Sequence, residues 1–376
     1  MSKIKTGPSI YIPTDKNIFD ALQHKKVTHS ELASFLRGRG ILVSNSTSKD
    51  ALVEKISSLT LSHSDFNWIG KLLENPNRKD KTTHSKLKGE IEDEQIQAAC
   101  SAVKANLTAL GDDSVKVTKS SDTTTLTVSY IEHDFRKTEM RQRTLKTCEI
   151  KLERDKDGVV MKLPSTKKAK EVSETLKKAV QAQVVKDTGN ELEEFLISLQ
   201  SITDAAFRSK FFDNLIRDVP GFEFDNVSSV DVYHLEQVEK DEFGEDDEDD
   251  EDDTVEARLA SYINKAALAG EGVLDSTEFK QLHNRGFYIY KIIWTAINKS
   301  HEGPKVEFEA RFGRPDLCTE FMYTVRGIYP YNSRTLEHNV TRKAATPYEN
   351  EKYNVNLRDA SEKALAKTLN LYKKKV

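Results

Sequence analysis

The fold of the N-terminal part is decided by residues 27–59, VTHSELASFLRGRGILVSNSTSKDALVEKISSL, in which two short amphipathic helices flank an extended loop. Thr28 and Glu31 have the spacing of a capping box, in which each side chain accepts a hydrogen bond from the other's backbone N–H. Apolar residues then recur every three or four positions, which is the period of one helical face. Gly38 and Gly40 follow and are expected to end the first helix. The stretch therefore predicts a small helical module.

The segments HSELASFLRGRGI and SKDALVEKI resemble the SAP motif, a helix–extended-loop–helix module whose relatives occur in several DNA- and RNA-binding proteins. The LVSNSTS connection is longer than the compact turn usual in that family. The resemblance implies a surface for nucleic acid, because basic side chains and exposed N–H groups at a helix N-terminus attract phosphate. The alternative is a module that only packs helices or contacts protein. The candidate phosphate contacts are Lys25, Lys26, Arg37, Arg39 and Lys49.

The charge of the chain is unevenly distributed. The 376 residues carry a formal net charge of −4, but DEFGEDDEDDEDD (241–253) contains eleven acidic residues, and the rest of the chain sums to +7. Such an acidic run buries too little apolar area to fold alone. It predicts a spacer, or else a strap that competes with nucleic acid for a basic surface.

Other global features favour a cytoplasmic protein, nucleoid-associated if bacterial and nuclear if eukaryotic. No apolar run approaches the roughly 18 residues of a spanning helix, and the N-terminus lacks the apolar core of a secretory signal. Three widely spaced cysteines argue against a disulfide framework and fit a reducing compartment.

An α+β chain of several domains is predicted from the changes in periodicity. Alternation with period two predicts strands near 126–152, and a DKDG turn (155–158) predicts a hairpin. Further strands are expected at GFYIYKIIWTAIN, VEFEARFG and EFMYTVRGIYPY, and a helix at NELEEFLISLQSI. A small helical module thus precedes two mixed regions of helix and antiparallel sheet. The predicted parts are a SAP-like module (1–75), a basic linker (76–89), an α+β domain (90–238), an acidic linker (239–254) and a second α+β domain (255–376).

Two groups of carboxylates offer a catalytic alternative. CEIKLERD places Glu149 and Lys151 on one strand face, and with Asp134 upstream the pattern is similar to the metal site of restriction-type nucleases. VEFEARFG places Glu307 and Glu309 on one face, where they suit a divalent cation. It resembles the first strand of the triphosphate tunnel phosphatases, but only 63 residues follow Gly313, too few for the tunnel's remaining strands. Both groups also fit the wet side of an ordinary sheet.

The sequence favours a non-catalytic nucleic-acid-binding scaffold or adaptor, with DNA the favoured partner and no cofactor. The alternative is a metal-dependent nuclease or phosphohydrolase that uses Mg²⁺ or Mn²⁺ and receives substrate from the N-terminal module. A third hypothesis is an interaction subunit of a larger assembly that binds partner proteins, such as an anti-phage defence system. No membrane partner is expected.

Overall fold

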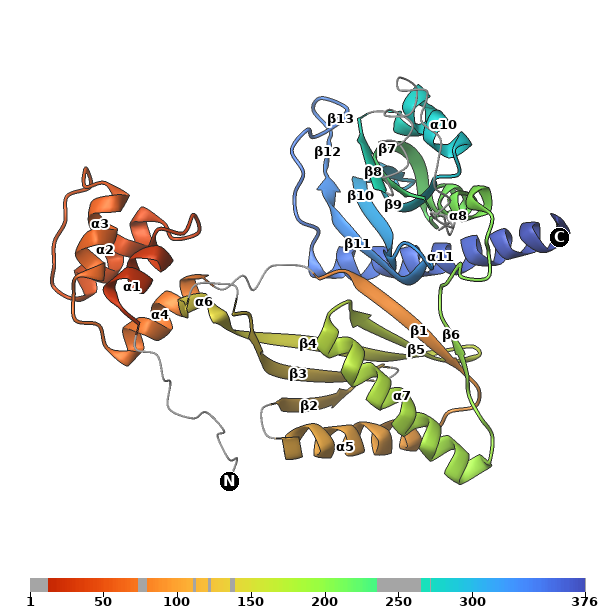
Figure 1. The fold of residues 1–376 in the computed structure, drawn as a ribbon, viewed down its shortest axis with the longest axis horizontal. Helices are drawn as coiled ribbons and strands as arrows, with labels where there is room; N and C mark the ends of the chain where they lie inside the picture. Colours follow the sequence, from red (N-terminus) through yellow and green to blue (C-terminus); the bar gives the residue numbers. More distant parts are fainter. Residues whose placement is uncertain are drawn as a thin grey trace, which may run out of the picture. The chain divides into compact units, whose positions relative to one another are not determined.

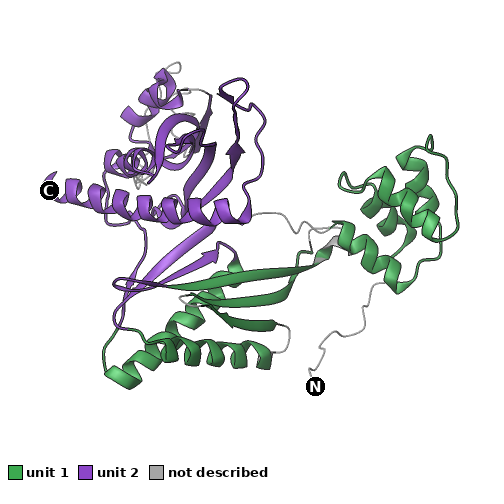
Figure 2. Ribbon diagram, turned by 180° about the vertical axis from the view of Figure 1, so that it is seen from behind, with its two compact units in different colours: residues 1–79, 91–153, 167–191 green, residues 80–90, 154–166, 192–376 purple. Residues whose placement is uncertain are grey.

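The computed structural model describes residues 13–73, 80–110, 113–120, 123–135, 139–234, 265–270 and 272–375. The chain forms two compact units, each assembled from several segments (Figures 1 and 2). Unit 1 comprises residues 1–79, 91–153 and 167–191, and unit 2 comprises residues 80–90, 154–166 and 192–376. The predicted class is confirmed: N-terminal helices precede regions of helix and antiparallel sheet.

Four helices open unit 1: α1 (Asp15–Leu22), α2 (His29–Gly38), α3 (Lys49–Ser57) and α4 (His63–Leu73). The capping box predicted at Thr28 and Glu31 is present, while Ser48 caps α3. Each cap satisfies backbone N–H groups that a helix start leaves unpaired. The apolar stripes meet in one core that contains Leu32, Leu36, Leu52, Ile56 and Ile69.

The remainder of unit 1 is a small sheet with two long helices. Strands β2 (Ser114–Lys119), β3 (Thr123–His133) and β4 (Arg143–Asp155) pair antiparallel in that order, with the short α6 (Glu139–Gln142) before β4. Leu126, Val128, Cys148 and Ile150 are buried on one face. Helix α5 (Asp93–Leu110) packs against α7 (Lys167–Thr188) and β2. The period of two in the sequence therefore reflects a sheet with one buried and one solvated face.

The sheet of unit 2 has the order β5-β1-β11-β10-β9-β7-β8, with β6 beside β1 (Figure 1). Its strands are β1 (Thr82–Lys88), β5 (Gly158–Pro164), β6 (Glu193–Phe195), β7 (Phe222–Tyr233), β8 (Lys265–Ala269), β9 (Tyr288–Asn298), β10 (Lys305–Arg314) and β11 (Thr319–Tyr329). A separate small ribbon pairs β12 (Tyr331–Asn332) with β13 (Glu337–His338). The strands predicted in the C-terminal region are thus confirmed as β9, β10 and β11.

Helices cover one face of this sheet. They are α8 (Ala205–Arg217) and α11 (Pro347–Lys375), which pack against each other; α8 also packs on β9 and α11 on β11. A short η1 (Val273–Asp275) and α10 (Thr277–Asn284) precede β9. The covered face carries an aromatic core that includes Trp294, Phe308 and Phe312, all fully buried. The opposite face of β10 carries Glu307, Glu309 and Arg311.

Two segments differ from their predicted structure. Residues 82–88 belong to the predicted basic linker 76–89, yet they form β1, where Lys86 and Leu87 are buried. The predicted helix NELEEFLISLQSI instead contains β6, because Phe195 pairs with Lys86 of β1. The DKDG turn does connect two successive strands of the chain, β4 and β5. The acidic linker 239–254 lies outside the described residues.

Candidate functional site

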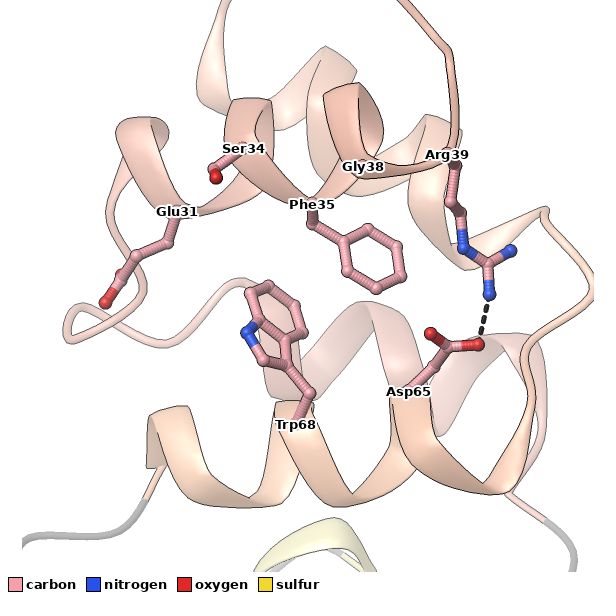
Figure 3. A pocket seen from close by; sticks show the side chains of 7 residues that line it. All are labelled: Glu31, Ser34, Phe35, Gly38, Arg39, Asp65 and Trp68. Atoms are coloured by element: carbon pink, nitrogen blue, oxygen red, sulfur yellow. Dashed lines mark hydrogen bonds and ion pairs between the residues drawn. The ribbon is translucent and has the colours of Figure 1, made fainter.

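Arg39, a predicted phosphate contact, is held by partners inside the N-terminal module. Its Nη1 donates to the carbonyl oxygen of Thr60 at 2.9 Å, and its Nη2 pairs with the carboxylate of Asp65 (Figure 3). The guanidinium also lies 5.0 Å from the ring centre of Phe35. Burial raises the pKa of Asp65, but hydrogen bonds from Ser62 and the Arg39 charge outweigh burial and lower it below its usual value. Arg39 therefore has a structural counter-ion.

The other four predicted contacts divide between internal and exposed positions. Lys49 donates its Nζ to the carbonyl oxygen of His24 at 3.0 Å, so its ammonium is also used internally. Lys26 is half-buried, and its backbone N–H donates to the His24 ring. Lys25 and Arg37 are exposed, and in the described part of the chain neither side chain has an ion pair or hydrogen bond. The predicted contacts thus do not act alike: the side chains of Arg39 and Lys49 have partners inside the module, whereas those of Lys25 and Arg37 are available.

A cavity of about 380 Å³ opens between α2 and α4. Figure 3 shows Phe35 and Trp68 pointing toward each other across it; their rings stack with centres 4.6 Å apart and planes 19° apart. Both side chains are half-buried. The full lining is Glu31, Ser34, Phe35, Gly38, Arg39, Asp65 and Trp68. Because the two rings stack on each other, their facing surfaces are already covered; the cavity offers the remaining ring surface and edges beside a fixed guanidinium, where another aromatic group can pack.

Sequence reasoning missed this cavity. Its aromatic lining comes from two helices that are separated along the chain. Phe35 lay on the predicted inner stripe of α2, and nothing in the sequence placed Trp68 against it. The spacing of Phe35 and Arg39, four residues apart and so on one helical face, was the available signal.

The nuclease-like residues do not come together. Glu149 of β4 pairs with Thr127 of β3, and Lys151 pairs with Thr125. Asp134 follows the end of β3, seven residues beyond Thr127, which is roughly 23 Å along an extended strand. Glu149 is exposed and Lys151 half-buried, on the face opposite the buried Cys148 and Ile150. These side chains lie on the solvated side of an ordinary sheet, which was the alternative to a metal site.

The second carboxylate pair is occupied by cations. Glu307 and Glu309 are 8% and 6% exposed. Arg326 bridges them, with Nε 2.9 Å from Glu307 and Nη1 3.2 Å from Glu309. Arg342 also pairs with Glu307 and Lys81 with Glu309.

Their burial corrects the expectation of a strand face open to water. The two carboxylates do share a face of β10, as predicted, but arginine and lysine groups fill the space that a metal ion would need. Across the described residues no group of three or more His, Cys, Asp or Glu side chains is placed to hold a metal. Nor does any helix in the described part of the chain have the length and apolar character needed to cross a membrane.

Comparison with known proteins gives one partial match. The family model described as the GAPS4b protein N-terminal domain matches residues 16–79, which contain α1 to α4 and the cavity. No curated protein matches the chain. The N-terminal helices are therefore a recognised module, similar to the N-terminal domain of GAPS4b proteins.

Proposed function

We propose that this protein is a non-catalytic nucleic-acid-binding adaptor whose N-terminal module contacts the ligand, with DNA favoured by the resemblance of α2 and α3 to the SAP motif. The observation that carries the proposal is the cavity beside Arg39, which is lined by the stacked rings of Phe35 and Trp68. Aromatic platforms combined with arginine are a general means of holding nucleic acid, because every base has a flat π-face. The exposed Arg37 and Lys25 supply phosphate contacts.

Charge reversal tests the phosphate contacts. The variant Lys25→Glu/Arg37→Glu is compared with Lys55→Glu/Lys71→Glu, which reverses two other exposed lysines of the same module. Fluorescence anisotropy with duplex DNA, single-stranded DNA and RNA over a salt series measures binding. For duplex DNA, loss of two phosphate contacts is expected to reduce the slope of log K against log salt by about 2. Equal losses of binding in both variants would show that Lys25 and Arg37 do not form the phosphate-contacting surface.

Tryptophan emission tests the cavity itself. The chain has two tryptophans, and Trp294 is fully buried in unit 2 while Trp68 lines the cavity. Nucleic acid that enters the cavity is expected to quench the emission of Trp68, and Trp68→Phe should abolish the signal while retaining the aromatic ring. Quenching that persists in Trp68→Phe would place the ligand elsewhere.

The enzymatic alternative draws no support from the geometry of its candidate residues. Asp134 and Glu149 lie far apart along the sheet, and Glu307 and Glu309 are neutralised by basic side chains. We expect no cleavage of plasmid or RNA with Mg²⁺ or Mn²⁺. Cleavage that is lost in Glu149→Gln or Glu307→Gln would establish the enzyme instead.

An interaction subunit is a second candidate, favoured by exposed apolar side chains at one end of β3 and β4. Ile131 and Leu145 are directly opposite partners in the sheet and are 38% and 63% exposed, and nearby Phe135 is 79% exposed. Exposed apolar side chains that lie together form the kind of surface at which proteins make contacts. Affinity purification with wild-type protein and Leu145→Asp tests this role: a stoichiometric partner should be lost with the variant alone.

A further inference from the structure

A row of charged side chains crosses three strands of unit 2. Asp231 of β7, Lys291 of β9 and Arg311 of β10 are consecutive partners in the strand register. Lys291 donates its Nζ to Asp231 at 2.8 Å. Side chains directly opposite each other on an antiparallel pair have Cβ atoms about 5 Å apart, so two like charges there repel. Arg311 of β10 therefore lies beside Lys291 of β9, and the counter-ion of Lys291, Asp231, is on the strand at the other side of β9.

The carboxylates of Glu307, Glu309 and Asp231 are already paired with other cations. Arg326 and Arg342 pair with Glu307, Lys81 and Arg326 pair with Glu309, and Lys291 pairs with Asp231. Four cations thus share these three carboxylates, and with Arg311 the group holds five cations and three carboxylates, an excess of two positive charges. The excess is centred on Arg311, whose side chain makes no hydrogen bond or ion pair within the described residues. Its Nε is buried without a hydrogen-bond partner.

The pKa of Lys81 responds to the same excess of positive charge. Burial lowers the pKa of the Lys81 ammonium; the charges of Arg311 and Lys291 lower it further, and Glu309 opposes both. Three cations are therefore within electrostatic reach of one another on a half-buried surface. A water molecule would satisfy the Nε hydrogen of Arg311 but would leave this repulsion in place. An anion would satisfy both.

We propose that Arg311 binds a phosphate group on this face of unit 2, with the neighbouring charges of Lys291 and Lys81 adding to the attraction. A guanidinium presents parallel N–H donors that match two phosphate oxygens, and the excess of two charges matches a dianion better than a carboxylate. The phosphate belongs either to a free nucleotide or to a nucleic-acid backbone. The site goes beyond the function proposed above, because it lies in unit 2 and uses no residue of the N-terminal module.

Thermal unfolding and calorimetric titration with pyrophosphate test the site, with chloride at equal ionic strength as the reference. The wild-type chain is expected to gain thermal stability with pyrophosphate in a saturable way. Arg311→Gln should weaken binding about tenfold or more, the usual effect of losing hydrogen bonds to a charged group. Arg314→Gln is the matched control, because Arg314 is an exposed arginine at the end of the same strand. A response absent from the wild type, or equal in all three proteins, overturns the site.

Two further ligands separate the sources of the phosphate. Tighter binding of a mononucleotide than of a short oligonucleotide assigns a small-molecule site, whereas the reverse assigns a nucleic-acid backbone. Both titrations are repeated in Lys25→Glu/Arg37→Glu. Loss of binding in Arg311→Gln alone supports the unit 2 site even if the N-terminal proposal fails. Loss of binding in Lys25→Glu/Arg37→Glu alone overturns the unit 2 site.

Discussion

Replacing Arg326 with glutamine is expected to destabilise unit 2 because one guanidinium serves two buried carboxylates. Its Nε and Nη1 lie 2.9 Å from Glu307 and 3.2 Å from Glu309, which are 8% and 6% exposed. Breaking a buried pair from one side costs about 3–5 kcal/mol, because a charge is left without a partner. Arg342 and Lys81 still neutralise the two carboxylates, and the Arg326 side chain is itself 32% exposed, so screening reduces the loss to about 2 kcal/mol.

Differential scanning calorimetry measures this loss directly. For a unit of this size about 1 kcal/mol corresponds to a change of about 2–4 °C in Tm, so a decrease of about 4–8 °C is expected. Arg311→Gln is the matched variant on the same face. Because Arg311 has no acidic partner and faces a lysine, its replacement should leave Tm unchanged or raise it. Equal decreases in the two variants would refute the assignment of counter-ions.

Three further changes probe other parts of the fold. Burial lowers the pKa of His84, so below about pH 6.5 the unfolded chain binds a proton at this residue while the folded chain does not. Calorimetry should therefore show that Tm falls as the pH is lowered from about 6.5 to 5. The fall in Tm should be smaller in His84→Gln. Leu36→Ala removes a fully buried side chain from the N-terminal core, and urea unfolding followed by Trp68 emission should report a loss of about 2–5 kcal/mol. Gly158→Ala would place a Cβ against the carbonyl oxygen of Leu87 at a φ of +151°, so urea unfolding should show that the free energy of unfolding falls by about 1 kcal/mol or more. In the control Gly38→Ala the new Cβ meets open space, so this variant should be neutral or stabilising.

The N-terminal helices could be predicted because their signals are local. The capping box at Thr28 and Glu31 and the apolar stripes lie within one or two turns of the residues they organise. The antiparallel strands near residues 126–152 and from β9 to β11 could also be predicted, the first from alternation along the strands and β9 from its run of β-branched and aromatic residues. Long-range contacts were not needed to identify either kind of element.

Strand β1 could not be predicted, because long-range partners determine its structure. THSKLK has no apolar alternation, and its lysines suggested a solvated tether. In the fold, β1 pairs with β5, β6 and β11, and the buried Lys86 finds carboxylates in Asp155 and Asp157. The same pairing makes a strand of residues 193–195, where helical periodicity predicted a helix. Tertiary pairing outweighed local preference in both segments.

The role of each predicted site residue depended on a counter-ion that the sequence could not identify. Arg39 is paired with Asp65, which lies 26 residues away, and Lys49 with the backbone oxygen of His24. Alternation correctly put Glu307 and Glu309 on one face, but their burial under arginines follows from β11 and from the loop that carries Arg342. Residue type and spacing show where charge is placed; they do not show whether another residue neutralises it.

Counter-ions therefore distinguish structural charges from those available to a ligand in both units. A paired charge has already exchanged its hydration for a fixed partner, and recruiting it for a ligand means breaking that pair. An unpaired cation near other cations gains from any anion that arrives, so the binding free energy includes relief of repulsion as well as attraction. By this criterion the groups proposed to bind a ligand are Arg37 and Lys25 in unit 1 and Arg311 in unit 2, while Arg39 lines the cavity together with Phe35 and Trp68. The charge-reversal and glutamine experiments address these groups, and each compares them with exposed basic residues of the same unit.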